Sequence, residues 1–130
     1  MTEPYSPIEE ATRKTRPLAL VTGASRGIGR ASALALAEAG YNLFLIARKE
    51  AEKLKDTAER CRSLGAVVEL RCTDIGDCEA CEDLFTALDL CPGSFKLLVA
   101  NAGISKLGLL QDLSPEEWDA MIRTDLSSCF

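Results

Sequence analysis

The chain has 130 residues, the usual length of one domain, and 47% of them are hydrophobic. No apolar run approaches the ~18 residues needed to cross a bilayer, so we expect a soluble, globular protein. Fifteen basic against twenty acidic residues give a net charge of −5, which disfavours nucleic acids and anionic membranes as partners. Histidine is absent, which excludes Ser/His/Asp and Cys/His catalytic units and histidine-containing metal sites, and no metal is expected.

The first segment, residues 1–16, reads MTEPYSPIEEATRKTR and is polar, with prolines at positions 4 and 7. It has neither the apolar core of a secretory signal nor the low acid content of a transit peptide. We therefore expect a disordered tail over 1–16 and one domain over 17–130. The six cysteines have no disulfide-framework context, so reduced thiols and a cytoplasmic location are expected.

Apolar runs alternate with segments of helical period along the rest of the chain. The runs predict strands at Leu18–Val21, Asn42–Ile46, Ala66–Leu70 and Phe95–Ala100. The intervening segments predict helices at about 27–39, 49–64, 77–90 and 114–128, the last beginning with a capping box at Ser114. This alternation indicates an α/β fold, a Rossmann-type doubly wound parallel sheet with strand order 3-2-1-4 and four helices. Because the fourth strand is apolar on both faces and no later strand pairs with its outer edge, we expect an incomplete sheet.

The stretch LALVTGASRGIGR joins the first predicted strand to an alanine-rich helix through three glycines. Gly23 permits a sharp turn, Gly27 lets the backbone approach a pyrophosphate, and Gly29 lets helix and sheet pack closely. The helix N-terminus would then face the phosphates. A glycine-rich turn without a ligand is the alternative. The predicted cofactor-binding residues of this motif are Gly23, Ser25, Arg26, Gly27, Ile28 and Gly29.

The end of the second strand carries a further signal about the cofactor. NAD-binding proteins of this architecture place an acid there to accept a hydrogen bond from the ribose 2′-OH, but Ile46–Lys49 contains none before Glu50. Arg48, together with Arg26, would neutralise a 2′-phosphate by charge-assisted hydrogen bonds. These residues predict NADP(H) as the cofactor, the alternative being that both arginines are solvated surface charges.

Polar residues also follow the third and fourth strands, where ligands collect in open α/β sheets. Asp74 is predicted to accept from an adenine amino group, and Asn101, Ala102 and Gly103 are predicted to border the adenosine. Turn formation alone explains the same residues and remains open. Cys78 and Cys81 form a C-x-x-C at the start of the third helix, but the acids around them disfavour a thiolate, so structural cysteines are expected.

With these residues placed, the chain resembles the short-chain dehydrogenase/reductase family, most closely its 3-oxoacyl-[acyl-carrier-protein] reductases. The resemblance lies in TGASRGIG, CTDIGD and NAGISKLGLLQDLSPEEWDAMIRTDLSSCF, and it covers residues 17–130, the N-terminal half of a typical member. It implies hydride transfer between a nicotinamide and a small-molecule carbonyl or alcohol. It also implies that the complete protein is a homo-oligomer.

The family's catalytic tyrosine and lysine form the pattern Y-x-x-x-K. Tyr5 and Tyr41 are the only tyrosines and neither has a lysine four residues later. Ser127 and Ser128 precede the place of the family's carbonyl-binding serine. We therefore expect that this chain is an N-terminal fragment, that it contains no catalytic residue and that it is inactive alone. The alternative is a non-catalytic remnant that binds a nucleotide, or a partner through its open edge.

Asp125 occupies the position at which the family has a catalytic asparagine, because Thr124-Asp125-Leu126 replaces the usual T-N-L pattern. Helical periodicity places Asp125 on one face with Trp118 and Ile122, and this face is predicted to turn inward. The alternative is that Asp125 reaches solvent, since an unpaired buried carboxylate is unfavourable.

Overall fold

The computed structural model describes residues 16–88 and 94–130, so nearly all of the predicted tail, together with the last residues of the predicted third helix, lies outside it. Within the described residues the strands form one parallel sheet in the order β3-β2-β1-β4, which confirms the predicted order. Central Leu20 of β1 pairs with Phe44 on one side and Leu98 on the other. The strands are β1 (Leu18–Thr22), β2 (Asn42–Ala47), β3 (Val68–Cys72) and β4 (Phe95–Val99).

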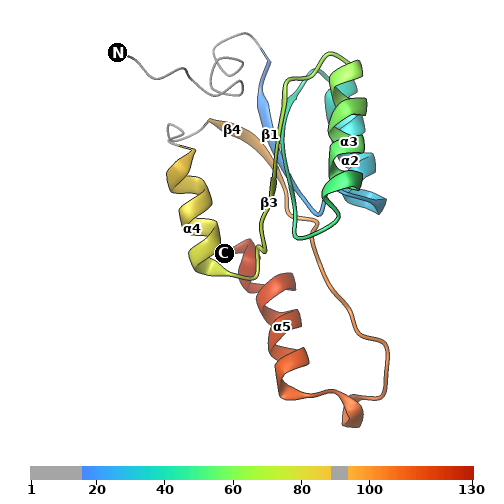
Figure 1. The fold of residues 1–130 in the computed structure, drawn as a ribbon, viewed down its shortest axis with the longest axis vertical. Coiled ribbons are helices and arrows are strands. Elements are labelled where there is room, and N and C mark those ends of the chain that lie inside the picture. The colour runs from blue at the N-terminus through green and yellow to red at the C-terminus, as the bar shows by residue number, and fades with distance from the viewer. Residues whose placement is uncertain (1–15, 89–93) are drawn as a thin grey trace.

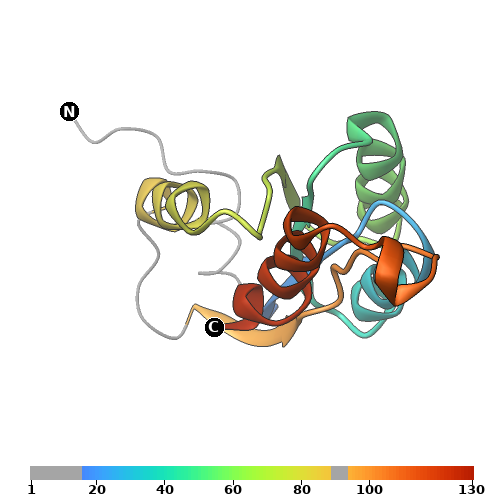
Figure 2. The ribbon, with the colours of Figure 1, turned by 90° about the horizontal axis from the view of Figure 1, so that it is seen from below.

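Helices follow each strand, as the alternating pattern predicts. In Figure 1 α2 and α3 lie on one side of the sheet and α4 on the other, while α5 lies beyond the carboxyl ends of the strands. Figure 2 looks along the sheet from that end and shows α5 between α3 and α4. The described helices are α2 (Gly27–Glu38), α3 (Ala51–Ser63), α4 (Cys78–Ala87) and α5 (Pro115–Asp125), with short 3₁₀ turns η1 (Leu110–Asp112) and η2 (Ser127–Cys129).

Some element boundaries differ from the predicted ones for identifiable reasons. The third strand begins at Val68 because the N–H of Ala66 still donates to Cys61 O at the end of α3, and that of Val67 donates to Asn42 Oδ1. The last helix ends at Asp125, not at 128, and its continuation tightens into the 3₁₀ turn η2. Its start is as predicted: Ser114 Oγ accepts from Glu117 N at 3.2 Å, and the Glu117 side chain accepts from Ser114 N at 3.0 Å.

Two apolar layers hold the central strands. On the α2 and α3 side, small residues such as Ala33 and Ala58 pack against Val21 and Leu45, which are fully buried. On the other side Phe44 is also fully buried and meets the ring of Phe95 edge-on at 6.2 Å between centroids. Burial of a side chain of this size contributes roughly 1.5–3 kcal/mol. The packed centre of the molecule is therefore β1 and β2 with α2 and α3.

The fourth strand and the last helix are much less covered. Leu98 is 55% exposed, and among the described residues no strand pairs with the outer edge of β4, as expected for an incomplete sheet. The predicted inward face of the last helix is not buried: Trp118 is 51% exposed and Ile122 is 37% exposed, because no described element packs over them. None of the described helices combines the length and the hydropathy required to cross a membrane.

Candidate functional site

A cavity of about 640 Å³ lies at the carboxyl ends of all four strands. Parallel strands bring the segments that follow them to the same edge of the sheet, which explains why residues from distant parts of the chain meet there. Every predicted cofactor-binding residue except Gly29 lines this cavity. Its lining residues are Gly23, Ser25, Arg26, Gly27, Ile28, Ile46, Ala47, Arg48, Lys49, Glu50, Thr73, Asp74, Ile75, Asn101, Ala102, Gly103, Ile104 and Thr124.

The glycines lie in the turn after β1 and in the first turn of α2, and they have different roles. Gly23 and Gly27 have left-handed backbone angles, with φ of 67° and 56°. A Cβ at Gly27 would meet no atom within 4 Å, so the backbone here is open to the cavity. A Cβ at Gly29 would lie 2.2 Å from Gly23 O and 2.5 Å from Asn101 Nδ2, so only glycine lets this part of α2 approach the turn and Asn101 so closely.

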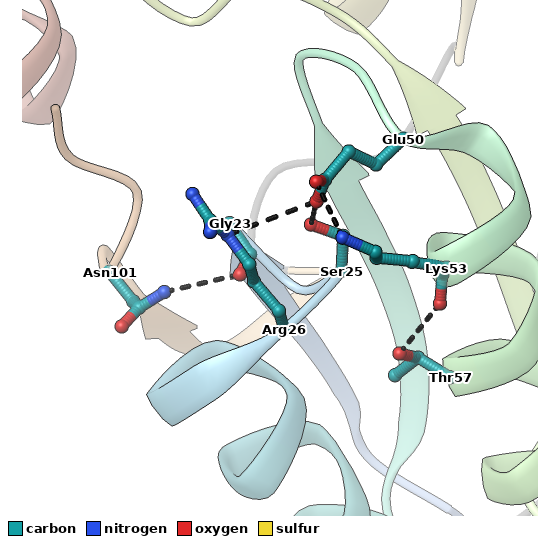
Figure 3. Close-up of polar contacts among 7 residues, drawn as sticks. All are labelled: Gly23, Ser25, Arg26, Glu50, Lys53, Thr57 and Asn101. Atoms are coloured by element: carbon teal, nitrogen blue, oxygen red, sulfur yellow. Dashed lines mark hydrogen bonds and ion pairs between the residues drawn. The ribbon is translucent and has the colours of Figure 1, made fainter.

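Thr22 and Asn101 join the glycine turn to the end of β4. Thr22 Oγ1 accepts from the backbone N–H groups of Asn101 at 3.1 Å and Ala102 at 3.0 Å. The Asn101 Nδ2 group donates to Thr22 O at 3.0 Å. It also donates to Gly23 O at 3.3 Å (Figure 3). The side-chain amide of Asn101 is thus used to hold the glycine turn against the end of β4, and both segments belong to the cavity wall. Sequence reasoning missed Thr22, because a threonine at the end of a strand carries no local signal for such a bond.

Glu50 is the second residue that sequence reasoning missed, although it is the first acid after Arg48. Its carboxylate accepts from Ser25 Oγ at 3.1 Å and from Lys53 Nζ at 2.8 Å, and it lies 3.8 Å from Arg26 Nε (Figure 3). The hydrogen bond from Lys53, and next that from Ser25, holds the pKa of Glu50 below its usual value. Two predicted cofactor-binding residues are therefore already engaged by an acid of the cavity wall.

Arg48 and Asp74 face each other across the same cavity. Arg48 Nη1 lies 3.8 Å from Asp74 Oδ2, and both side chains remain nearly half exposed. Asp74 Oδ1 accepts from the backbone N–H of Gly76 at 2.9 Å, so the turn-forming role left open for this residue is confirmed. Thr124 of α5 packs closely on that turn, since a Cβ at Gly76 would lie 2.9 Å from Thr124 Oγ1. The predicted contact of Asp74 with adenine stays a prediction.

Asp125 lies outside the lining of the cavity and is solvent-exposed. Its Oδ1 atom accepts from the backbone N–H of Ile104 at 2.8 Å, which ties α5 to the segment that follows β4. The prediction that periodicity turns Asp125 inward is therefore wrong, and the alternative, a carboxylate that reaches solvent, describes this residue. Ser128 donates its hydroxyl to Thr124 O at 2.5 Å. Tyr41 lies just before β2, at the opposite end of the sheet from the cavity.

Two of the cysteines that the structure describes, Cys61 and Cys81, have a raised thiol pKa. Burial raises the pKa of Cys61 from 9.0 to about 11. For Cys81 of the C-x-x-C, burial and next the neighbouring Cys78 and acid charges raise the pKa of the thiol. Both effects oppose the thiolate that redox chemistry requires, in agreement with the prediction.

The sequence of this chain is similar to those of known short-chain dehydrogenases. The family model for short chain dehydrogenase matches residues 17–130. The chain is 38% identical over 112 residues to the 3-oxoacyl-[acyl-carrier-protein] reductase of Staphylococcus aureus, covering 86% of this chain and 46% of that protein. It thus spans about half the length of the curated relatives it matches.

Solved structures of similar fold contain either nicotinamide cofactor. A metagenomic short-chain oxidoreductase in complex with NADP has a TM-score of 0.79 and 35% identity, over 86% of this chain and 51% of its own. Carveol dehydrogenase from Mycobacterium avium in complex with NAD has a TM-score of 0.73 and 26% identity, over 89% of this chain and 46% of its own. The fold is therefore shared by proteins that bind NADP and proteins that bind NAD.

Proposed function

The chain belongs to the short-chain dehydrogenase family, and from that premise we propose that its cavity binds NADP(H) for hydride transfer to or from a small-molecule carbonyl or alcohol. The observation that carries this proposal is the turn from Gly23 to Gly27, which opens onto the cavity directly before the N-terminus of α2. Unpaired N–H groups at such a terminus favour the phosphates of a dinucleotide. The open space at Gly27 leaves room for that approach.

The preference for NADP over NAD rests on the two arginines. Arg26 and Arg48 line the cavity, are 78% and 47% exposed, and lie 3.8 Å from Glu50 and Asp74 respectively. These separations are longer than a direct hydrogen bond, so neither arginine is held in a tight ion pair. Each charge-assisted contact to the phosphate would contribute roughly 1.5–3 kcal/mol before desolvation losses.

Catalysis by these 130 residues is not part of the proposal. Reduction of a carbonyl requires a proton for the developing alkoxide, and a positioned general acid contributes typically 10²–10⁴-fold. The family's Y-x-x-x-K pattern is absent from the sequence, and Asp125 lies outside the cavity lining. The bound nicotinamide would supply the hydride, while the residues of this chain bind and orient its adenosine and phosphates. Homo-oligomerisation of the complete protein remains a prediction from the resemblance, and a cytoplasmic location remains a prediction from the cysteine content.

Fluorescence titration with NADPH and NADH tests the cofactor assignment. The chain should bind NADPH more tightly, and Arg48→Ala should remove most of that preference. Arg60→Ala is the matched control, because it removes the same charge from an exposed position of α3 outside the cavity lining. Equal affinities for the two nucleotides, or a preference that survives Arg48→Ala, would defeat the assignment.

Turnover measurements test the catalytic half of the proposal separately. NADPH oxidation with an acetoacetyl or quinone substrate should not exceed a buffer control. Steady turnover that is lost in Gly23→Val would show that the chain contains an acid we have not identified. Binding of neither nucleotide would instead favour a remnant without a cofactor.

A further inference from the structure

Glu50 has an unusual backbone conformation for its residue type. Its φ of 63° and ψ of 47° are left-handed, and among the described residues it is the one non-glycine with a positive φ. Non-glycine residues adopt this region infrequently, and Glu is not among the types that favour it. Glu50 is also the N-cap of α3, yet its side chain makes no capping bond to that helix. The carboxylate is turned instead toward the glycine turn.

Two hydrogen-bond donors and one nearby cation converge on this carboxylate. Ser25 supplies a hydroxyl at 3.1 Å, Lys53 an ammonium at 2.8 Å, and Arg26 a guanidinium at 3.8 Å (Figure 3). Lys53 belongs to a well-fixed turn of α3, because the fully buried Thr57 donates its hydroxyl to Lys53 O at 3.0 Å. Two separate elements, the glycine turn and α3, therefore direct positive or hydrogen-bonding groups at one carboxylate of the cavity wall, although Lys53 itself lies outside the cavity lining.

The same donor set suits a phosphate monoester better than a carboxylate. A phosphate has three acceptor oxygens and close to two negative charges at neutral pH, whereas the carboxylate has two oxygens and one charge. The two anions cannot share these donors without strong repulsion. The Glu50 side chain is 35% exposed, so it has a path into solvent.

Building on the proposed NADP(H) site, we propose that Glu50 is an internal competitor that sets cofactor preference, because its carboxylate occupies the donors that the 2′-phosphate would use. Binding of NADP(H) then requires the carboxylate to leave Ser25 and Arg26, whereas NAD(H) has no 2′-phosphate and leaves it in place. Glu50 thus weakens NADP(H) binding selectively.

The test uses the same titrations with two variants and a matched control. Glu50→Gln keeps the shape of the side chain, and Glu50→Gly removes it while placing at the left-handed position the residue best suited to that backbone. Glu52→Gln makes the same charge change two residues away, where the side chain is 88% exposed and pairs with Lys55. Both Glu50 variants should bind NADPH roughly tenfold more tightly, the equivalent of one charge-assisted contact regained. NADH affinity, and both affinities of Glu52→Gln, should be unchanged.

The outcomes separate this inference from the proposed function. If the chain and its variants bind both nucleotides but the Glu50 substitutions leave NADPH affinity as it was, the competitor role is wrong and the proposed function stands. If the substitutions weaken NADH instead, Glu50 accepts from the ribose and the inference is overturned. If no variant binds either nucleotide, the proposed function fails and this inference falls with it.

Discussion

Substitution of Gly29 by alanine gives a direct test of how the glycine turn is packed. Helix propensity alone predicts that this change inside α2 stabilises the protein, by about 0.8–1.0 kcal/mol. The structure predicts the opposite, because the added Cβ would lie 2.2 Å from Gly23 O and 2.5 Å from Asn101 Nδ2. The first of these atoms is backbone and can move only if the turn moves.

The magnitude follows from the groups that must shift. Overpacking of this kind costs about 1–3 kcal/mol. Displacing Asn101 also weakens its bonds to Thr22 O and Gly23 O, each worth about 0.5–1.5 kcal/mol. After the gain in propensity is subtracted, we expect a net loss of about 1–5 kcal/mol in the free energy of unfolding.

Urea unfolding followed by circular dichroism measures this loss. Gly40→Ala is the control, since a Cβ there would meet no atom within 4 Å and only the left-handed φ of 89° is unfavourable. The control should lose about 1–2 kcal/mol from backbone strain. A Gly29→Ala protein that is more stable than the parent chain would refute the packing of the turn described above.

Three further predictions concern other parts of the molecule. Thr22→Val should lower the free energy of unfolding by about 1–3 kcal/mol and weaken nucleotide binding, because two backbone N–H groups lose their acceptor. Unchanged stability in urea would contradict this prediction. Burial raises the pKa of the Cys61 thiol from 9.0 to about 11, so the unfolded chain loses this proton at a lower pH than the folded protein. The free energy of unfolding should therefore fall as pH rises from 9 to 11. The same decline in Cys61→Ala would show that another group causes it. The apolar side chains exposed around Leu98 and Trp118 should bind a hydrophobic dye and promote self-association of the 130-residue chain, so a dye-silent monomer in light scattering would count against the open edge.

The strands, their order and the approximate site were predictable because local patterns carry that information. Apolar runs alternate with helical segments, and the right-handed crossover of parallel strands then limits the order of the sheet. The glycine spacing at positions 23, 27 and 29 predicts a turn against a helix N-terminus, and the cavity lies there. The resemblance to short-chain dehydrogenases rests on these local segments and agrees with the family match.

The contacts that shape the cavity wall were decided only by the tertiary structure. Glu50 meets Ser25 across 25 residues of sequence, and Asn101 meets Thr22 across 79, so no window along the chain contains both partners. The left-handed backbone at Glu50 is not predictable from its residue type either, because surrounding contacts rather than intrinsic preference hold it there. Likewise, periodicity identified the apolar face of α5, but burial depends on a covering element that the described residues do not supply. Local sequence determines which elements form, whereas the side chains that share a hydrogen bond are selected by the packing that brings distant elements together.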